Sequence, residues 1–299
     1  MTAFTFRPAW PEDKQRMLEI TARTWGEHGD YITEVWDSWL VDPKGELTVA
    51  EVDGLVVALA KITWQGEGQW WLEGLRVDPE RRLKGVGQAM NAYQLELIKR
   101  WGGGVVRYAT GIRNDGSHRI AERAGFTVLA RFVERVAEKL EGPVEAKALT
   151  RADLDAVWNI TRDSDLLQAA NGAYVFEWKA SRMTRERLAE YLDRGVVMGI
   201  RDGAGRVCAW GLVEHVPELD RLGLMSLDGT TDGITALARA ARAHAAVLGQ
   251  ELVDVVTTPH PRALQALEAA GYHIEIDPEH PEDVSEHGVD IFELRLDQA

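Results

Sequence analysis

The chain is nearly devoid of cysteine and has no long apolar run. Its one cysteine among 299 residues is Cys208, so no disulfide can form within the chain, and we expect this side chain to be a small apolar residue on a strand. No segment approaches the roughly 18 consecutive apolar residues that a membrane-spanning helix needs, and residues 1–7 lack a charged and then apolar leader. The sequence therefore predicts a cytoplasmic protein with no membrane partner.

Positive charge is also scarce. The 34 lysines and arginines are outnumbered by 48 aspartates and glutamates, which gives a formal net charge of -14. A field of this sign repels nucleic acid and anionic lipid, whereas it tolerates or attracts a substrate that carries an amine. We therefore expect a small amine-bearing partner and no nucleic-acid partner.

What the sequence does contain is a strand that runs through a glycine-bearing turn into a helix. Residues 70–77 have the aromatic and branched content of a strand, and residues 86–101 carry apolar side chains at helical spacing. The turn between them therefore lies at a helix N-terminus, where amides without partners and the helix dipole favour an anion. Gly85 and Gly87 lack side chains and so let the backbone approach phosphate oxygens. Arg82 and Lys84 add cationic hydrogen-bond donors at the same turn.

Two other phosphate-binding loops are excluded by their spacing. A P-loop needs Gly-x-x-x-x-Gly-Lys-Ser/Thr, and a dinucleotide fingerprint needs three spaced glycines after the first strand of a βαβ unit. Neither pattern is present. On the turn alone, a basic surface loop that binds no ligand stays an open alternative.

A second pattern follows the first along the chain. Residues 105–110 read as a strand, Asn114 comes next, and a short helical stretch leads to Gly125 and Phe126. Gly125 is suited to a helix C-cap, with Phe126 turning back onto the core. Strand, basic loop, helix, strand, Asn, helix and Gly-Phe thus succeed one another within residues 1–140.

Together these residues resemble the GNAT superfamily of N-acetyltransferases. Arg82-x-x-Gly85-x-Gly87 matches the Arg/Gln-x-x-Gly-x-Gly/Ala loop of that family, and a helix-like stretch before the Asp53-Gly54 hairpin turn agrees with its element order. The resemblance implies an α/β (α+β mixed sheet) fold, with a central mixed, mostly antiparallel sheet flanked by helices. Residues 29–31 and 71–77 are similar to a subgroup of histidine N-acetyltransferase-like proteins.

The second half of the chain repeats this organisation. Residues 253–258 and 263–272 echo the later strand and the Gly-Phe helix, so the chain resembles two tandem GNAT-like domains. We expect an acetyl-CoA-binding catalytic domain over residues 1–142 and a degenerate domain over residues 145–299, with Gly142-Pro143 at the boundary.

The second half departs from the family where chemistry is expected. Its loop at residues 228–234 carries two carboxylates and no Arg/Gln-x-x-Gly-x-Gly, and carboxylates repel a pyrophosphate. His260 stands in the place of Asn114. We expect this half not to bind coenzyme A, and instead to complete the sheet, line the substrate cleft or form a homodimer.

The resemblance implies acetyl-CoA as the co-substrate and no metal. In the family, backbone amides of the fourth strand pair with the pantetheine arm, and Leu75 and Val77 hold these positions here. Asn114 and Ser117 would lie nearer the pantetheine arm. The residues that would face the pyrophosphate are Arg82, Leu83, Lys84, Gly85, Val86, Gly87 and Gln88.

Acetyl transfer to an amine needs a base, because an ammonium ion cannot attack a thioester. Related enzymes place a carboxylate on the fourth strand, and Glu73 is the candidate here. Alternation along a strand puts it on the same face as Leu75, two residues on. Glu27, His28 and Asp30 are alternatives on the segment that commonly lines the acceptor site.

The general acid is harder to assign. Many family members carry a Tyr in the helix before Gly-Phe, and the corresponding residue here is Ala121. Tyr31 is our candidate for the acid, with Tyr93, Tyr108 or a water as alternatives. A thiol with a pKa near 8.5 is a tolerable leaving group without such help. The missing Tyr keeps a second function open, a non-catalytic acyl-CoA-binding or regulatory module.

Two further features of the sequence raise expectations. His273, His280 and His287 are seven residues apart, a spacing that raises the possibility of a metal site. Prolines between them would break any helix that could align the three side chains, so we expect a solvated acidic loop instead. The first domain lacks a strand after residues 126–134, and we expect a neighbouring segment or chain to supply it.

Overall fold

The chain folds into two compact units, and each takes segments from both halves of the sequence. The computed structural model describes residues 4–25, 30–66, 68–81, 84–216, 220–276 and 286–297. Unit 1 comprises Met1–Ala109, Asn114–Thr127 and Phe292–Ala299, and unit 2 comprises Thr110–Arg113 and Val128–Ile291.

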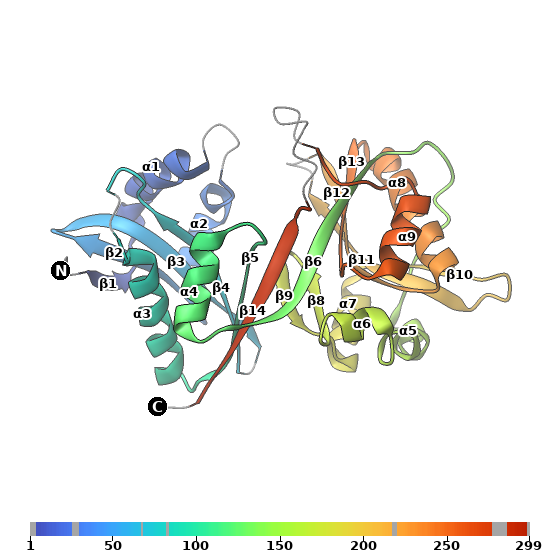
Figure 1. Ribbon diagram of the computed structural model, residues 1–299. Helices are drawn as coiled ribbons and strands as arrows, with labels where there is room; N and C mark the ends of the chain where they lie inside the picture. The colour runs from blue at the N-terminus through green and yellow to red at the C-terminus, as the bar shows by residue number, and fades with distance from the viewer. Residues whose placement is uncertain are drawn as a thin grey trace. The chain divides into compact units, whose positions relative to one another are not determined.

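Unit 1 is a mixed sheet with helices on both faces (Figure 1). The strand order is β1-β2-β3-β4-β5-β14, in which β1–β2, β2–β3 and β3–β4 are antiparallel pairs and β4–β5 is a parallel pair. Its elements are β1 (Thr5–Pro8), a 3-10 turn (Pro11–Asp13), α1 (Lys14–Trp25), α2 (Ile32–Leu40), β2 (Glu46–Val52), β3 (Leu55–Gly66), β4 (Gln69–Val77), α3 (Val86–Arg100), β5 (Gly104–Gly111), α4 (Asp115–Ala124) and the later part of β14 (Gly288–Leu296).

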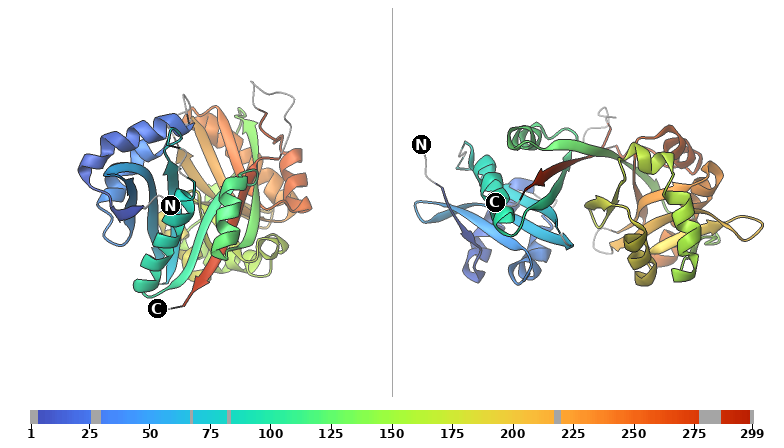
Figure 2. Two further views of the ribbon diagram at one scale, coloured as in Figure 1. Left: turned by 60° about the vertical axis from the view of Figure 1, so that its left-hand side comes forward. Right: turned by 90° about the horizontal axis from the view of Figure 1, so that it is seen from below.

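The two faces of this sheet bury different helices. Strand alternation sends Val49 and Leu59 toward α1 and α2, where they pack with Trp36, whereas Ala50 and Ala58 face α3. Figure 2 shows in its right-hand view that α1 and α2 lie on one side of these strands and α3 on the other. The burial of both faces explains the near-continuous apolar run of β3.

Unit 2 repeats the succession of elements seen in unit 1. Its strand order is β6-β13-β12-β11-β10-β7, and the one parallel pair described is β12 with β13. Its elements are β6 (Thr127–Glu138), β7 (Lys147–Ala148), a 3-10 turn (Arg151–Asp153), α5 (Leu154–Thr161), α6 (Asp165–Ala169), β8 (Ala173–Phe176), β9 (Lys179–Arg182), α7 (Arg185–Arg194), β10 (Val197–Arg201), β11 (Val207–Val216), β12 (Arg221–Gly229), α8 (Thr231–Leu248), β13 (Leu252–Thr257), α9 (Pro261–Ala269) and the start of β14.

The two compact units are divided at other residues than the expected domain boundary at Gly142-Pro143. Strand β6 precedes that dipeptide, yet its residues pair with β13 in unit 2, from Val133 opposite Thr257 to Glu138 opposite Leu252. The cause is register: a strand joins whichever sheet supplies its ladder partner, whatever its place in the chain.

The strand that unit 1 lacked comes from the far end of the chain. Phe292 of β14 stacks on Tyr108 of β5 with the ring centroids 5.3 Å apart, and both lie in one apolar cluster with Phe126. Arg107, which is fully buried, donates to the Glu293 carboxylate at 2.7 Å. Residues 292–296 therefore belong to unit 1, as a segment from elsewhere in the chain that supplies the missing strand.

We expect Phe292→Ala to destabilise unit 1 by about 3 to 5 kcal/mol, because it leaves a cavity at a site that is 3% exposed. Hydrogen exchange in the peptide over Gly104–Gly111 should accelerate. The matched control is Phe132→Ala, an equally buried Phe of unit 2, which should act on Leu252–Thr257. If both variants accelerated hydrogen exchange equally in Gly104–Gly111 and in Leu252–Thr257, the division of the chain into these two units would be contradicted.

Candidate functional site

The central feature of unit 1 is the point where β4 and β5 part. Their parallel ladder runs from Gln69 opposite Val105 to Trp71 opposite Arg107 and ends there, although β4 continues to Val77. The β5 edge of β4 beyond Trp71 thus carries alternating amides and carbonyls outside that ladder. Such an edge can pair with an extended amide-bearing ligand.

Helix α3 begins beside this opening with its first amides uncapped. Gly85 is the N-cap residue in a left-handed conformation, with φ of 89°, and among the described residues no side chain caps the helix. A Cβ at Gly85 would meet no described atom within 4 Å, whereas one at Gly87 would lie 3.3 Å from Ile120. The first turn therefore presents N–H groups and a positive dipole end to an approaching anion.

The rest of the predicted pyrophosphate loop is only partly described. Lys84 and Gln88 are exposed, Val86 is buried against the sheet, and the side-chain oxygen Oε1 of Gln88 accepts a hydrogen bond from Arg123 at 3.1 Å. Arg82 and Leu83 lie outside the described residues.

The predicted Asn114 site is a helix cap. The Asn114 side chain accepts a hydrogen bond from the Ser117 amide at 3.1 Å and so begins α4. The helix ends at Gly125 in a left-handed conformation, and the Phe126 amide returns to Ala121, as the sequence predicted. Asn114 thus has a structural role, and Ser117 lies in the first turn beside it.

Strand β4 bends through a bulge that the sequence did not reveal. Lys61 pairs with Glu73 and Leu59 with Arg76, so β4 has one extra residue, and Gly74 takes it up with φ of 68°. A Cβ at Gly74 would lie 2.7 Å from the Trp39 ring, so only glycine fits.

The bulge corrects one expectation about Glu73. Its carboxylate lies on the α2 face and accepts a hydrogen bond from Thr63, whereas the Leu75 side chain faces Gly87 of α3. Glu73 and Leu75 are therefore on opposite faces, because the extra residue reverses the alternation between them. Only a glycine inside a strand pattern could have signalled this.

Tyr31, the candidate acid, lies near Glu73. Arg76 anchors the preceding residue, donating to the Asp30 carboxylate at 2.6 and 3.1 Å, and its guanidinium lies 5.6 Å from the Tyr31 ring centre. Partial burial of Tyr31, which stays 45% exposed, and next the negative charge of Glu73 raise the pKa of its phenol to about 12, so the phenol holds its proton at neutral pH. Asp30 is thus engaged with Arg76, and the alternatives Glu27 and His28 lie outside the described residues.

The other tyrosines serve packing. Tyr93 stacks on Phe6 with ring centroids 4.9 Å apart, and burial raises its pKa. Tyr108 donates to the Ser117 carbonyl at 3.2 Å, and burial raises its pKa to about 12. Ala121 is fully buried on α4 and offers no hydroxyl.

In unit 2 the corresponding helix start is closed by its own side chains. Thr230 caps α8 by accepting the Gly233 amide at 3.1 Å, and Asp228 accepts the Gly229 amide at 2.7 Å. His260 caps α9 through its Nδ1, the role that Asn114 has in unit 1. One of the first-turn amides that α3 leaves without a side-chain cap therefore has a partner in α8.

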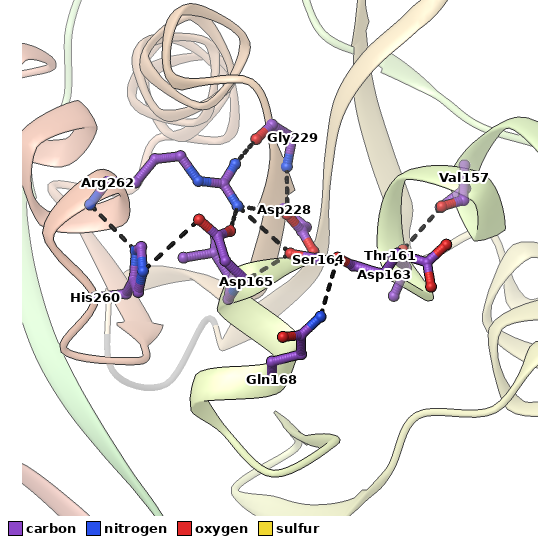
Figure 3. A network of polar contacts seen from close by, with 11 residues as sticks. Val157, Thr161, Asp163, Ser164, Asp165, Gln168, Asp228, Gly229, His260 and Arg262 are labelled. Carbon is purple, nitrogen blue, oxygen red and sulfur yellow. Dashed lines mark hydrogen bonds and ion pairs between the residues drawn. The ribbon is translucent and has the colours of Figure 1, made fainter.

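Arg262 lies next to this helix start (Figure 3). Its guanidinium donates to the Gly229 carbonyl and to Asp165, and it lies 3.5 Å from Asp228. Where β12 and β13 part, Ser226 exchanges hydrogen bonds with the Val175 backbone of β8 at 2.8 and 3.0 Å. In unit 2 the chain's own groups therefore contact the helix start and the strand edge that correspond to the open ones described in unit 1.

Asp228 gives unit 2 a pH-dependent stability. Burial raises its pKa to about 6, so the folded state holds a proton that the unfolded chain releases between about pH 4 and 6. The free energy of unfolding therefore falls as pH rises through this window, by at most about 3 kcal/mol. Asp228→Asn should remove this slope in urea titrations followed by hydrogen exchange in β13.

The matched control has the opposite sign. Hydrogen bonds from the backbone and side chain of Arg206 lower the pKa of Asp202, which is exposed on the β10–β11 turn. The ionised Asp202 carboxylate adds to the free energy of unfolding above its ordinary pKa, and this stabilisation is lost as the pH falls. Asp202→Asn should therefore lower the free energy of unfolding less at acid pH than at neutral pH. A parallel response of both variants would refute the assignment to Asp228.

The remaining expectations concern metals, membranes and Cys208. Among the described residues, no group of three or more His, Cys, Asp or Glu side chains could hold a metal ion, and His280 lies outside them. No described helix combines the length and apolar character that crossing a bilayer requires. Cys208 lies on β11 as expected but is only partly buried, with its thiol 3.5 Å from the Ile200 carbonyl.

The parted parallel strands, the open helix start and the capped second helix define an acyltransferase-type α/β fold of the GNAT kind. Residues 14–126 match the acetyltransferase (GNAT) family, so the chain carries an acetyltransferase domain of this family. Both the resemblance seen in the sequence and the α/β fold class are confirmed.

Known proteins share this fold along the whole chain. A GCN5-related N-acetyltransferase from Sphaerobacter thermophilus is similar over 98% of this chain and 96% of its own, with a TM-score of 0.67 and 15% identity. A tandem GNAT protein from the clavulanic acid biosynthesis pathway is similar over 98% of each chain, with a TM-score of 0.60 and 14% identity.

One curated relative extends beyond the matched family region. It is a histidine N-acetyltransferase from Oreochromis niloticus, 26% identical over 213 residues that cover 64% of this chain and 63% of the relative. The chain thus spans less than two thirds of the length of the curated relatives that it matches.

Proposed function

We propose that the protein is an acetyl-CoA-dependent N-acetyltransferase that transfers acetyl to a primary amine of a small molecule, an amino acid or a related amine. The observation that carries the proposal is the divergence of β4 from β5 beside the uncapped, glycine-headed start of α3. An extended amide-bearing arm and a diphosphate are the two parts of coenzyme A that such an edge and such a helix start would bind.

The described residues fit this cofactor. Gly85, Val86 and Gly87 bring three successive amides to one point, and the space into which a Gly85 side chain would project contains no described atom. Lys84 adds a cation at the same turn. Arg82, Leu83 and Gln88 complete the proposed pyrophosphate loop, Leu75 and Val77 provide the strand edge, and Asn114 and Ser117 lie at the α4 start.

Acetyl-CoA supplies an activated thioester, and the protein must remove a proton from the acceptor ammonium so that a neutral amine can attack. For a lysine-like amine the neutral form costs roughly 4.6 kcal/mol at pH 7, and for an α-amino group about 1 to 1.4 kcal/mol. Glu73 accepts that proton. The amine nitrogen then bonds to the thioester carbonyl carbon, the carbon–sulfur bond breaks, and the sulfur leaves with its electron pair. The nitrogen gives up a second proton as the amide forms, and this proton replaces the one that Tyr31 gives to the sulfur.

Tyr31 completes the proton balance in this proposal. Its pKa of about 12 keeps the phenol protonated at neutral pH, so it can donate a hydrogen bond or its proton to the departing sulfur. Ala121 cannot do this, since it carries no ionisable group. The Arg76–Asp30 ion pair holds the Tyr31 backbone next to β4.

We assign the cofactor to unit 1 alone. In unit 2, Thr230 and Arg262 occupy the helix start, and Asp228 places a carboxylate where a diphosphate would lie. The acceptor class is supported by the net charge and by the name of the relative from Oreochromis niloticus. We also propose a cytoplasmic location.

A non-catalytic acyl-CoA-binding module is the second candidate, favoured by the buried Ala121. Calorimetry with acetyl-CoA, followed by a thiol-release assay over the twenty amino acids and simple diamines, separates the two. Binding with turnover supports the enzyme, binding without turnover on any amine supports the module, and the absence of binding excludes both.

A further inference from the structure

Unit 2 keeps a small cavity where β12 and β13 part. The parallel ladder between these strands ends at Met225 opposite Val256, although β12 continues to Gly229. The cavity lies beyond the end of the ladder and is lined by both strands, by β11 and by side chains of α6 and β8. The space open to the centres of water-sized molecules is about 30 Å³. One water needs at least about 10 to 15 Å³ by this measure, so the cavity has room for about two or three.

Two buried polar atoms of the cavity lining lack hydrogen-bond partners. Trp210 of β11 and Thr258 after β13 are 2% and 5% exposed, and both border the cavity. Neither the Trp210 Nε1 nor the Thr258 Oγ1 has a partner among the described residues. An unpaired buried donor is costly, because it loses its hydrogen bonds to water and gains none in return. Such atoms beside open space indicate a bound molecule.

The other hydroxyl groups around the cavity whose contacts are described do have partners. The Thr161 hydroxyl donates to the Val157 carbonyl at 2.8 Å, within α5. The Tyr174 hydroxyl lies 2.9 Å from the Tyr191 hydroxyl, and Ser226 bonds to the β8 backbone. The unpaired atoms are therefore two particular positions, and not a general lack of partners around the cavity.

Asp228 adds a carboxyl group beside the unpaired indole. It pairs directly with Trp210 in the β11–β12 register, so the two side chains lie on the same face of the sheet. Asp228 is 4% exposed, and the Arg262 guanidinium lies 3.5 Å from its carboxylate (Figure 3). At neutral pH an anion in the cavity would face Asp228, and a cation would face Arg262. The site therefore favours an uncharged molecule.

A primary amide matches these groups. Its carbonyl oxygen can accept from the Trp210 indole, which only donates, and from the Thr258 hydroxyl. Its NH2 group can donate to the Asp228 carboxylate, and if Asp228 is protonated the amide oxygen can accept from it instead. A short apolar end would lie against the apolar side chains of the lining, among them Phe132 and Leu166.

We infer that this cavity is a binding site for a small uncharged molecule with a carbonyl oxygen next to an N–H donor, a primary amide of about four non-hydrogen atoms. Such a molecule takes about the volume of three waters, which is the room available. The inference concerns unit 2 and does not depend on the acetyl transfer proposed for unit 1.

The test is a titration of the protein, with isotope-labelled tryptophan, against acetamide, followed by NMR at the indole N–H resonances. Trp210→Phe identifies the Trp210 resonance by its loss. We expect this resonance to shift until it saturates, with a dissociation constant of about 1 to 10 mM, which is within the affinity limit for so small a ligand. The other tryptophans are internal controls, and their resonances should shift only in proportion to the concentration.

Three molecules of the same shape separate the contributions of the ligand's groups. Acetone keeps the carbonyl but has no N–H, acetate is an anion, and acetamidinium is a cation without an acceptor. At constant ionic strength we expect acetone to bind about tenfold more weakly than acetamide. Neither ion should produce a saturating shift of Trp210 in the same concentration range.

A pair of threonine variants tests the unpaired hydroxyl. Thr258→Val keeps the branched shape and removes the donor, so the affinity for acetamide should fall about tenfold. The matched control is Thr161→Val, because Thr161 also lines the cavity but its hydroxyl is already bonded to Val157. We expect this control to bind acetamide as the parent protein does. Unchanged resonances of the remaining tryptophans show that each variant is folded.

Each contrary result overturns the inference. If the Trp210 resonance shifts no differently from those of the other tryptophans, the cavity holds water alone. If acetate or acetamidinium binds as tightly as acetamide, the ligand is an ion and not an amide. Equal losses of affinity in Thr258→Val and Thr161→Val would show that the shape of the cavity, and not the unpaired hydroxyl, decides binding.

Discussion

Replacing Gly85 by Asp should weaken acetyl-CoA binding by at least about 100-fold, measured by calorimetry. The substitution places a carboxylate at the start of α3, where the diphosphate is expected to lie against the first amides. Two like charges about 4 Å apart repel by about 4 kcal/mol at the effective dielectric of a protein surface, and 1.4 kcal/mol is a factor of ten. The expected loss is thus well above the error of the measurement.

The neutral isostere separates charge from backbone strain. Gly85 has φ of 89°, where Asn and Asp are both tolerated better than other side chains, so Gly85→Asn carries the same strain without the charge. We expect Asn to reduce affinity only modestly. A second control, Gly54→Asp, puts a carboxylate at another left-handed glycine with no described atom near its Cβ, in the β2–β3 turn, and should bind normally.

Equal weakening by Asp and Asn at position 85 would show that backbone geometry, and not an anion, explains the effect. Normal binding in Gly85→Asp would remove the diphosphate from this helix start. The proposed function would then have no cofactor site in unit 1.

Replacing Glu73 by Gln should lower kcat by about 100- to 10,000-fold while acetyl-CoA binds as in the parent protein. Gln is nearly isosteric and still accepts a hydrogen bond from Thr63, but it cannot take a proton from the acceptor ammonium. The residual rate should rise with pH toward the pKa of the acceptor, because the variant depends on amine that is already neutral. Assays of thiol release, stopped at fixed times and run from pH 6 to 10, measure how the rate of the variant depends on pH.

The matched control for Glu73 is Glu46→Gln. Glu46 is also a half-buried strand glutamate that accepts a threonine hydroxyl, and burial raises its pKa. It lies on β2, two strands from β4, and we expect unchanged kinetics. If Glu73→Gln keeps the parent rate across this pH range, another group is the base.

Local chemistry made several features predictable. Asp53 and Gly54 both adopt positive φ in the β2–β3 turn, as an Asp-Gly pair between apolar runs predicts. Gly125 and Phe126 end α4 as read from the sequence, and the helix start at Gly85 follows from the change of apolar period. Each of these depends on residues within a few positions of one another.

Long-range pairing was not predictable in the same way. The extra residue at Gly74 becomes a bulge only because β3 fixes the register on both sides, and it moves the Glu73 carboxylate to the α2 face, away from Leu75. The Thr63–Glu73 contact follows from the same register. Nothing in the spacing of residues 63 and 73 signals it, since a loop of any length could separate the two strands.

The sequence by itself determined the glycine-headed start of α3, most of the order of strands and helices, and the absence of the Arg-x-x-Gly-x-Gly pattern from the second half, because these depend on neighbouring residues. Only the tertiary structure decided that β6 pairs in unit 2, that Phe292–Leu296 completes unit 1, and which face carries Glu73. The physical reason is that ladder hydrogen bonds and buried apolar surface are shared between segments far apart in the chain, and their free energy exists only once those segments meet.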